Sequence, residues 1–307
     1  MLTFILRRLL SSILVLFIVV CVTFLLARKM KGGPFDREKE PPPHVKVMLE
    51  KKYHLSGSVW AQLGAYLNQL VLEGNLGLST KNKDRTVAEI LGQKLPNSMQ
   101  LGAVAFLIAS LGGVAAGFVA AMKKDSALDV SSMFVALAAI SIPTFITGPL
   151  CIAVFGLWLG WLPIGGFGSF DQFILPSICL ALPFLAYVAR LTRNSLLDVL
   201  SQNFMRTAKA KGLSQAGALS RHALKVAILP VVTYLGPMAA YVLTGSFVIE
   251  NVFNISGVGG VFVNAIQNRD CFLLTGAVII YSALIVFFNL IVDVLYTFLD
   301  KRINLHA

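Results

Sequence analysis

Six apolar segments, each long enough to cross a lipid bilayer, most constrain what this chain can fold into. They lie at about residues 9–27, 98–122, 130–159, 173–189, 228–249 and 272–295. A helix of about 17–25 apolar residues spans the hydrocarbon core, where all backbone polar groups have to be paired within the protein. With 56% hydrophobic and 13% charged residues, the sequence predicts an all-α polytopic membrane protein with six transmembrane helices. A soluble domain is excluded.

The basic residues next to these segments predict the orientation of the chain. With six spans and both termini inside, thirteen basic side chains lie in short cytoplasmic segments: Arg7, Arg8, Lys123, Lys124, Arg190, Arg193, Arg206, Lys209, Lys211, Arg221, Lys225, Lys301 and Arg302. The two short outer loops then hold only Arg269. Because Lys and Arg are retained on the cytoplasmic side, we expect both termini to be cytoplasmic. Anionic lipid and a partner protein account for the net charge of +11, so nucleic acid is not predicted as a partner.

The first apolar segment follows Arg7 and Arg8, and a secretory signal peptide is the alternative interpretation of it. The run is longer than the usual apolar region of about 7–15 residues in a signal peptide. In addition, Leu25 does not fit a small-residue cleavage site that ends at Ala27. We therefore expect an uncleaved first span.

A basic stretch from Arg190 to Pro230 separates the fourth and fifth spans and holds seven basic residues against one acid, Asp198. Its first part predicts a helix with one apolar stripe, formed by Leu197, Leu200, Phe204 and Ala208. Gly212 is expected to end this helix, and Ser214 to cap a second one. This alternation favours a rigid knob on the membrane surface over a basic loop that merely satisfies the charge rule.

The same stretch resembles a known family. Arg206-Thr207-Ala208, with Gly212 four residues later, is similar to the EAA loop of ABC-type import permeases, although Arg206 stands where the general pattern has glutamate. The string at 206–213, followed by Arg221-His222, is closer to the B-type permease subunit of peptide importers. Residues 74–79 and 248–270 also resemble sequences of that subunit, so the likeness covers nearly the whole chain.

The resemblance implies a type I ABC importer permease fold in a bacterial cytoplasmic membrane. It implies two ATPase subunits, a homologous C-type permease subunit and an extracytoplasmic solute-binding protein as partners. ATP and Mg would be bound by the ATPase, and no cofactor by this chain. The implied cargo is a short peptide, with nickel, glutathione or another small solute as the alternative. The loop expected to dock on the ATPase contains Arg206, Thr207, Ala208, Lys209, Ala210, Lys211, Gly212, Leu213, Ser214, Arg221 and His222.

Small residues recur at every fourth position of the second span: Ala105, Ala109, Gly113, Gly117 and Ala121. Lipid gives little hydrophobic force between helices, and close backbone approach across small residues is what holds them together. The pattern predicts a tight helix contact. Its position near the permeation path and ordinary bundle packing are both compatible with it.

Two further segments carry structural predictions. Pro143, and Pro149 beside Gly148, interrupt the third span, which indicates either a break at a mid-membrane site or an ordinary kink. Between the first two spans, residues 59–73 predict an amphipathic helix that lies on the bilayer or caps the bundle. One face of that helix is expected to carry Trp60, Leu63, Leu67, Leu70 and Val71.

The outer loop after the fifth span contains Glu250, Arg269 and Asp270. The Arg-Asp pair belongs to the resemblance, since such a pair recurs in this loop of peptide permeases. Glu250 is expected to have a local or helix-end role, with contact to a binding protein as the alternative.

The chain carries no motif for chemistry of its own. It has no HExxH, Gly-x-Ser-x-Gly or GxxxxGK[ST] sequence, and its four Cys and four His residues do not have metal-ligand spacing. We therefore predict a non-enzymatic subunit whose energy comes from a separate ATPase, and a gradient-driven carrier is the alternative of a different class. The expected organisation is a first span with an outer region at 1–93, a transmembrane domain at 94–299 with its coupling loop at 190–227, and a tail at 300–307.

Overall fold

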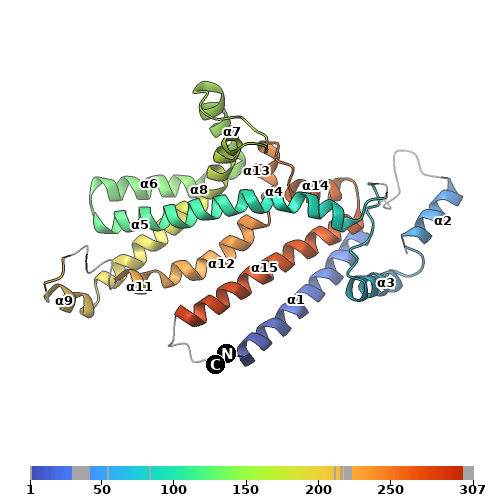
Figure 1. Ribbon diagram of the computed structural model, residues 1–307, viewed down its shortest axis with the longest axis horizontal. Helices are drawn as coiled ribbons and strands as arrows, with labels where there is room; N and C mark the ends of the chain where they lie inside the picture. Colours follow the sequence, from blue (N-terminus) through green and yellow to red (C-terminus); the bar gives the residue numbers. More distant parts are fainter. Residues whose placement is uncertain are drawn as a thin grey trace. The chain divides into compact units, whose positions relative to one another are not determined.

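The computed structural model describes residues 2–29, 42–53, 55–82, 84–210, 212–214, 217 and 223–299, and the regular structure of these residues is helical (Figure 1). A single isolated bridge pairs Leu78 with Thr86. Five helices are long and apolar enough to cross a membrane, or six spans if one bent pair is counted as a span. The prediction of an all-α protein with six membrane segments is thereby confirmed, whereas the cytoplasmic placement of the termini stays a prediction.

Except in the fifth predicted span, the spanning helices are longer than the apolar segments that predicted them. They are α1 (Leu2–Lys29), α4 (Val87–Leu107), which continues through a π-helical turn (Ile108–Gly112) into α5 (Gly113–Met122), then α8 (Phe170–Leu200), α12 (Leu229–Leu243) and α15 (Cys271–Leu299). Helix α8 runs well past the predicted end at residue 189. As a result, Arg190 and Arg193 lie on the membrane-spanning helix itself rather than in a loop.

The third predicted span is broken sharply. Its halves are α6 (Ala127–Ser141) and α7 (Thr144–Cys151), which continues into a second π-helical segment (Ile152–Trp158), and the chain bends by 108° between the two halves. The break falls at Pro143, which has no N–H to donate and holds the preceding Ile142 in an extended conformation with ψ 120°. The interruption predicted at this proline is confirmed.

The fifth predicted span is not one continuous helix. Helix α12 ends at Leu243, and a short helix, α13 (Phe247–Val252), follows after a turn in which Gly245 adopts a φ of +100°. That left-handed conformation suits glycine and ends a helix. The remaining helices are α2 (Pro43–Lys52), α3 (Val59–Leu72), α9 (Asn203–Ala210), α11 (Leu224–Ala227) and α14 (Val258–Gln267).

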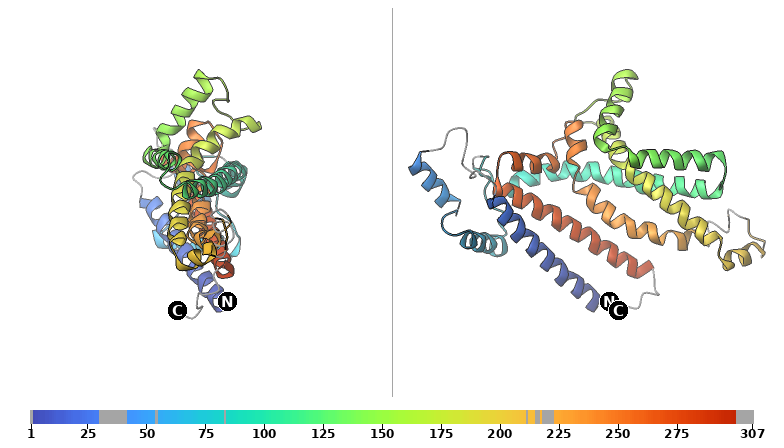
Figure 2. Two further views of the ribbon diagram at one scale, coloured as in Figure 1. Left: turned by 90° about the vertical axis from the view of Figure 1, so that its left-hand side faces the viewer. Right: turned by 180° about the vertical axis from the view of Figure 1, so that it is seen from behind.

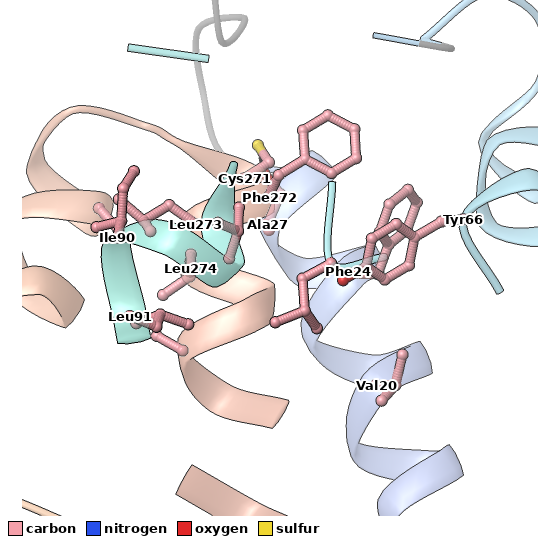
Figure 3. Close-up of a cluster of buried hydrophobic side chains, with 14 of the residues drawn as sticks. Val20, Phe24, Ala27, Tyr66, Ile90, Leu91, Cys271, Phe272, Leu273 and Leu274 are labelled. Atoms are coloured by element: carbon pink, nitrogen blue, oxygen red, sulfur yellow. Dashed lines mark hydrogen bonds between the residues drawn. The ribbon is translucent and has the colours of Figure 1, made fainter. Parts of the chain in front are cut away.

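The chain forms two compact units, Met1–Ser98 with Ser256–Val286 and Met99–Ile255 with Phe287–Ala307. In the first unit, α1, α3, α4 and α15 bury Phe24, Tyr66, Leu91 and Phe272 in one apolar cluster (Figure 3). In the second unit, α5 and α6 form an antiparallel pair that packs on α8 (Figures 1 and 2). The domain boundaries at residues 93 and 299 stay predictions.

Helix α3 forms where the sequence predicts it, and three residues of the predicted apolar face, Leu63, Leu67 and Leu70, pack in the apolar cluster of the first unit, but the other two do not. Trp60 and Val71 are exposed, whereas Gln62, Leu63 and Tyr66 are buried. Tertiary contacts set this rotation: the Tyr66 ring stacks on Phe24, and Gln62 Nε2 donates to a backbone carbonyl at 2.8 Å.

Candidate functional site

The predicted docking loop begins at the end of α8. The helix ends at Leu200, and α9 begins only at Asn203, so the continuous stripe predicted from Leu197 to Ala208 is wrong. The chain turns at Ser201, whose hydroxyl donates to the Asp198 carbonyl at 2.7 Å. This turn buries Met205 in place of Phe204.

An apolar cluster fixes this loop to the spans. Met205 of α9 packs with residues from the ends of α5, α8 and α11, with Leu213 half-buried against them. We call this set the loop-anchoring cluster; its buried members are Ala121, Leu196, Val199, Met205, Ala223 and Ala227. A displacement of α9 is therefore opposed by contacts with α5 and α8.

The turn after α9 is set by glycine. Gly212 has a φ of +86°, is exposed, and an added Cβ would meet no atom of the described residues within 4 Å. Two residues later, Ser214 Oγ accepts the backbone N–H of Gly217 at 3.2 Å, which is the contact of a helix-capping side chain. The backbone therefore changes direction at the position where the sequence predicts it.

Other predicted docking residues are only partly described. Thr207 and Ala210 are exposed, and Thr207 Oγ1 donates to the Asn203 carbonyl at 3.2 Å. The side chains of Arg206, Ala208 and Lys209, and the whole of Lys211, Arg221 and His222, lie outside the described part of the chain. Docking itself stays a proposal.

The small residues of the second span lie on a buried face. Ala105, Ala109 and Ala121 are buried, and so are Gly113 and Gly117. A Cβ added at Gly113 would lie 2.7 Å from the Val188 Cβ atom, and one at Gly117 would overlap the Ala189 carbonyl. The backbones of α5 and α8 are thus in direct contact at these two glycines, while a place near the permeation path stays a prediction.

A buried ion pair joins α6 to α8, and the sequence analysis missed it. Arg193 donates from Nε to Asp129 Oδ1 at 2.5 Å and from Nη2 to Oδ2 at 2.6 Å. The Asp129 side chain is 2% exposed and that of Arg193 is 19% exposed. The Asp125 backbone N–H donates to the same carboxylate at 3.0 Å. This two-pronged contact fixes the turn between α5 and α6 to α8.

Ser79 and Asp270, which belong to the two outer segments that resemble peptide permeases, lie together in the first unit. The buried Asp270 carboxylate accepts from the Ser79 hydroxyl and from the backbone N–H groups of Thr80 and Leu273, the latter two at 3.2 Å. It thereby caps the start of α15, where a negative charge is favourable. Tyr53 donates its hydroxyl to the Ser79 carbonyl at 3.2 Å, and burial raises the pKa of Tyr53, which keeps the phenol a neutral donor.

The other outer-loop residues differ in exposure. Arg269 is exposed and has a φ of +56°. Glu250 is buried in the first turn of α13, which agrees with the helix-end role expected from the sequence. Contact between Glu250 and a binding protein stays a prediction. Among the described residues, no three His, Cys, Asp or Glu side chains are grouped as metal ligands.

Comparisons with known proteins identify the family. Residues 113–305 match the family described as binding-protein-dependent transport system inner membrane component. The chain is 44% identical to the oligopeptide transport system permease protein OppB of Salmonella typhimurium over 306 residues, which is 99% of this chain and 100% of that protein. It is 37% identical to the dipeptide transport system permease protein DppB of Bacillus subtilis, over 99% of this chain and 98% of that one.

A solved structure shares the fold. A chain of the MetNI methionine ABC transporter, in an inward-facing conformation, superimposes with a TM-score of 0.58 at 13% identity, over 69% of this chain and 97% of that chain. The fold is therefore that of an ABC importer permease of type I. Taken together with the match at residues 113–305, the similarity over the full length shows that the chain belongs to the family of binding-protein-dependent transport system inner membrane components.

Proposed function

We propose that this chain is the permease subunit of an ATP-driven importer that moves short peptides across the bacterial cytoplasmic membrane. The observation that carries the proposal is the similarity to oligopeptide and dipeptide permeases, which extends over 99% of the chain and so includes its outer segments. Nickel, glutathione or another small solute on the same architecture is the second candidate. The chain acts as a transport subunit, and a separate ATPase subunit hydrolyses ATP.

The proposed assembly has two ATPase subunits, this chain, a homologous C-type permease and an extracytoplasmic binding protein. We propose that the ATPase contacts the exposed surface of α9 and the turn at Gly212–Ser214. When the ATPase subunits close on ATP, they displace α9. The loop-anchoring cluster passes this displacement to α5 and α8, and the pair of Asp129 and Arg193 passes it on to α6. The spans then change between inward- and outward-facing states.

Reconstitution of the complete complex in vesicles tests the proposed function. With its ATPase, C-type permease and binding protein present, we expect ATP-dependent accumulation of a labelled short peptide and no accumulation without ATP. Labelled nickel and glutathione are compared in the same vesicles. Accumulation of either in place of the peptide would reassign the cargo. Uptake by this chain alone, driven by an ion gradient, would contradict the proposal and favour a gradient-driven carrier.

Replacing Gly212 with Val tests the coupling role of the loop. A residue with a Cβ atom is strained by about 1–2 kcal/mol in the left-handed conformation of Gly212. This strain lowers the population of the native turn roughly tenfold. Because a Cβ at this exposed position meets no neighbour in the part of the chain that the structure describes, the strain stays local. We expect normal membrane insertion and complex yield, with peptide uptake about tenfold lower per ATP hydrolysed.

The matched control is Gly212→Asn, because Asn tolerates the left-handed conformation. We expect uptake by the Asn variant to stay close to that of the parent protein. Equal uptake by the Val and Asn variants would contradict the proposal that the turn at Gly212 docks on the ATPase.

A further inference from the structure

The exposed side of α3 is largely apolar, and the described residues of its own unit leave it uncovered. Helix α3 has no charged residue anywhere in Val59–Leu72. One side of it is buried through Leu63 and Tyr66. On the other side, the exposed fractions are 71% for Trp60 and 74% for both Val71 and Leu72. Asn68 is the one polar residue exposed on α3, whereas a fully solvated helix would be expected to carry charged groups there as well.

The structure also places α3 at a definite level along the first membrane span. Tyr66 of α3 stacks on Phe24 of α1, with ring centroids 5.2 Å apart (Figure 3). Phe24 lies five residues before Lys29, where α1 ends. At 1.5 Å per residue, the stacking point is about 7.5 Å inside the end of the span. Helices that lie in a membrane interface are buried by about 5–10 Å, at the boundary between headgroups and acyl chains.

The chemistry of the exposed side fits lipid better than a soluble protein. Trp is enriched at membrane interfaces because its ring is apolar and its indole N–H is polar. At the same level of α1, Val22 and Leu26 are exposed as well, so α1 also presents apolar surface there. A docking surface for a soluble binding protein would be expected to have a polar rim, to which α3 contributes Asn68 as its single exposed polar side chain and no charged one.

We propose that α3 is an interfacial anchor, with Trp60, Val71 and Leu72 inserted at the boundary between headgroups and acyl chains. One side of the helix then packs on α1 and the other on lipid. The anchor fixes the segment between the first two spans at the membrane surface. The proposal requires only that α1 spans the membrane, and it is independent of the cargo and of the docking loop.

Fluorescence quenching by brominated lipid tests the anchor in the complete complex. The chain has three Trp residues, so Trp158→Phe and Trp161→Phe together leave Trp60 as its only one. The same chain with Trp60→Phe added gives the emission of the partner subunits, which is subtracted. We expect phosphatidylcholine brominated near the headgroup end of its acyl chains to quench the Trp60 emission, because an interfacial helix is buried by about 5–10 Å. Lipid brominated near the bilayer centre should quench it clearly less.

A Trp at a second position tests whether the exposed side of α3 as a whole, and not Trp60 alone, contacts lipid. Val71→Trp in the chain that lacks the other three Trp residues should show the same depth dependence, because Val71 lies on the same exposed side. Absence of quenching by either lipid at both positions would overturn the proposal. Emission that responds to aqueous acrylamide, and is protected when purified binding protein is added, would also overturn it and would assign this face to that protein.

Discussion

Replacing Gly117 with Leu is expected to abolish assembly of the complex. A Cβ atom at this position would overlap the Ala189 carbonyl and lie 2.7 Å from the Thr192 Cβ atom. The first obstacle is backbone, so α5 and α8 would have to separate. Overpacking of a well-packed interior costs about 1–3 kcal/mol, and a whole Leu side chain between two backbones is expected to exceed that range. The yield of complex after detergent extraction and size-exclusion chromatography measures the effect.

Ala115→Leu is the matched control, because Ala115 lies on the same helix but is exposed. The added side chain there faces away from α8, and we expect the yield of complex to remain unchanged. If Gly117→Leu were as well tolerated as Ala115→Leu, the close contact between α5 and α8 would not hold the spans together. Small residues at these positions would then have another cause.

The contact face of α5 is predictable because its signal is local. Every fourth residue from Ala105 to Ala121 is Gly or Ala, and periodicity alone places them on one side. The identity of the partner helix is not local, because nothing near Ala189 in the sequence marks it as the opposing surface. Pro143 is intermediate in this respect: it predicts where the helix breaks, whereas the angle of 108° depends on what the two halves pack against.

The predicted stripe on α3 is wrong at Trp60 and Val71 for a related reason. Without a charged face, apolar periodicity cannot distinguish the buried side of a helix from a side that meets lipid. The contact of Tyr66 with Phe24 decides the rotation, and it joins residues far apart in the chain. In the docking loop, the positions of Gly212 and Ser214 are predictable from their backbone preferences. The turn at Ser201 is not, because burial of Met205 decides it.

The ion pair of Asp129 and Arg193 was the least predictable feature and gives the second large expected effect. Removal of one partner from a buried pair costs about 3–5 kcal/mol, because the other charge stays without compensation. Since the Asp129 side chain is 2% exposed and that of Arg193 is 19% exposed, the carboxylate is the more costly group to leave alone. We expect Arg193→Met to destabilise the protein more than Asp129→Leu does.

The expected ranking of the variants by stability makes this prediction specific. The double variant Asp129→Leu/Arg193→Met should recover most of the lost stability, because replacing both charges by apolar groups is often neutral or stabilising. Lys52→Ala is the control, since it removes the exposed pair that Lys52 forms with Asp84 at 3.1 Å. Exposed pairs contribute about 0–1 kcal/mol. The midpoint of thermal unfolding of the purified complex measures the stability of all four variants.

Stability and coupling can be separated in the same four variants. If the pair transmits motion from α8 to α6, the double variant regains its unfolding temperature but not its uptake per ATP hydrolysed, because an apolar contact lacks the fixed two-pronged geometry of the pair. If the pair only stabilises the fold, uptake returns together with stability. Single variants that unfold at the parent temperature would contradict both roles, since an uncompensated charge in a buried site cannot be free of cost.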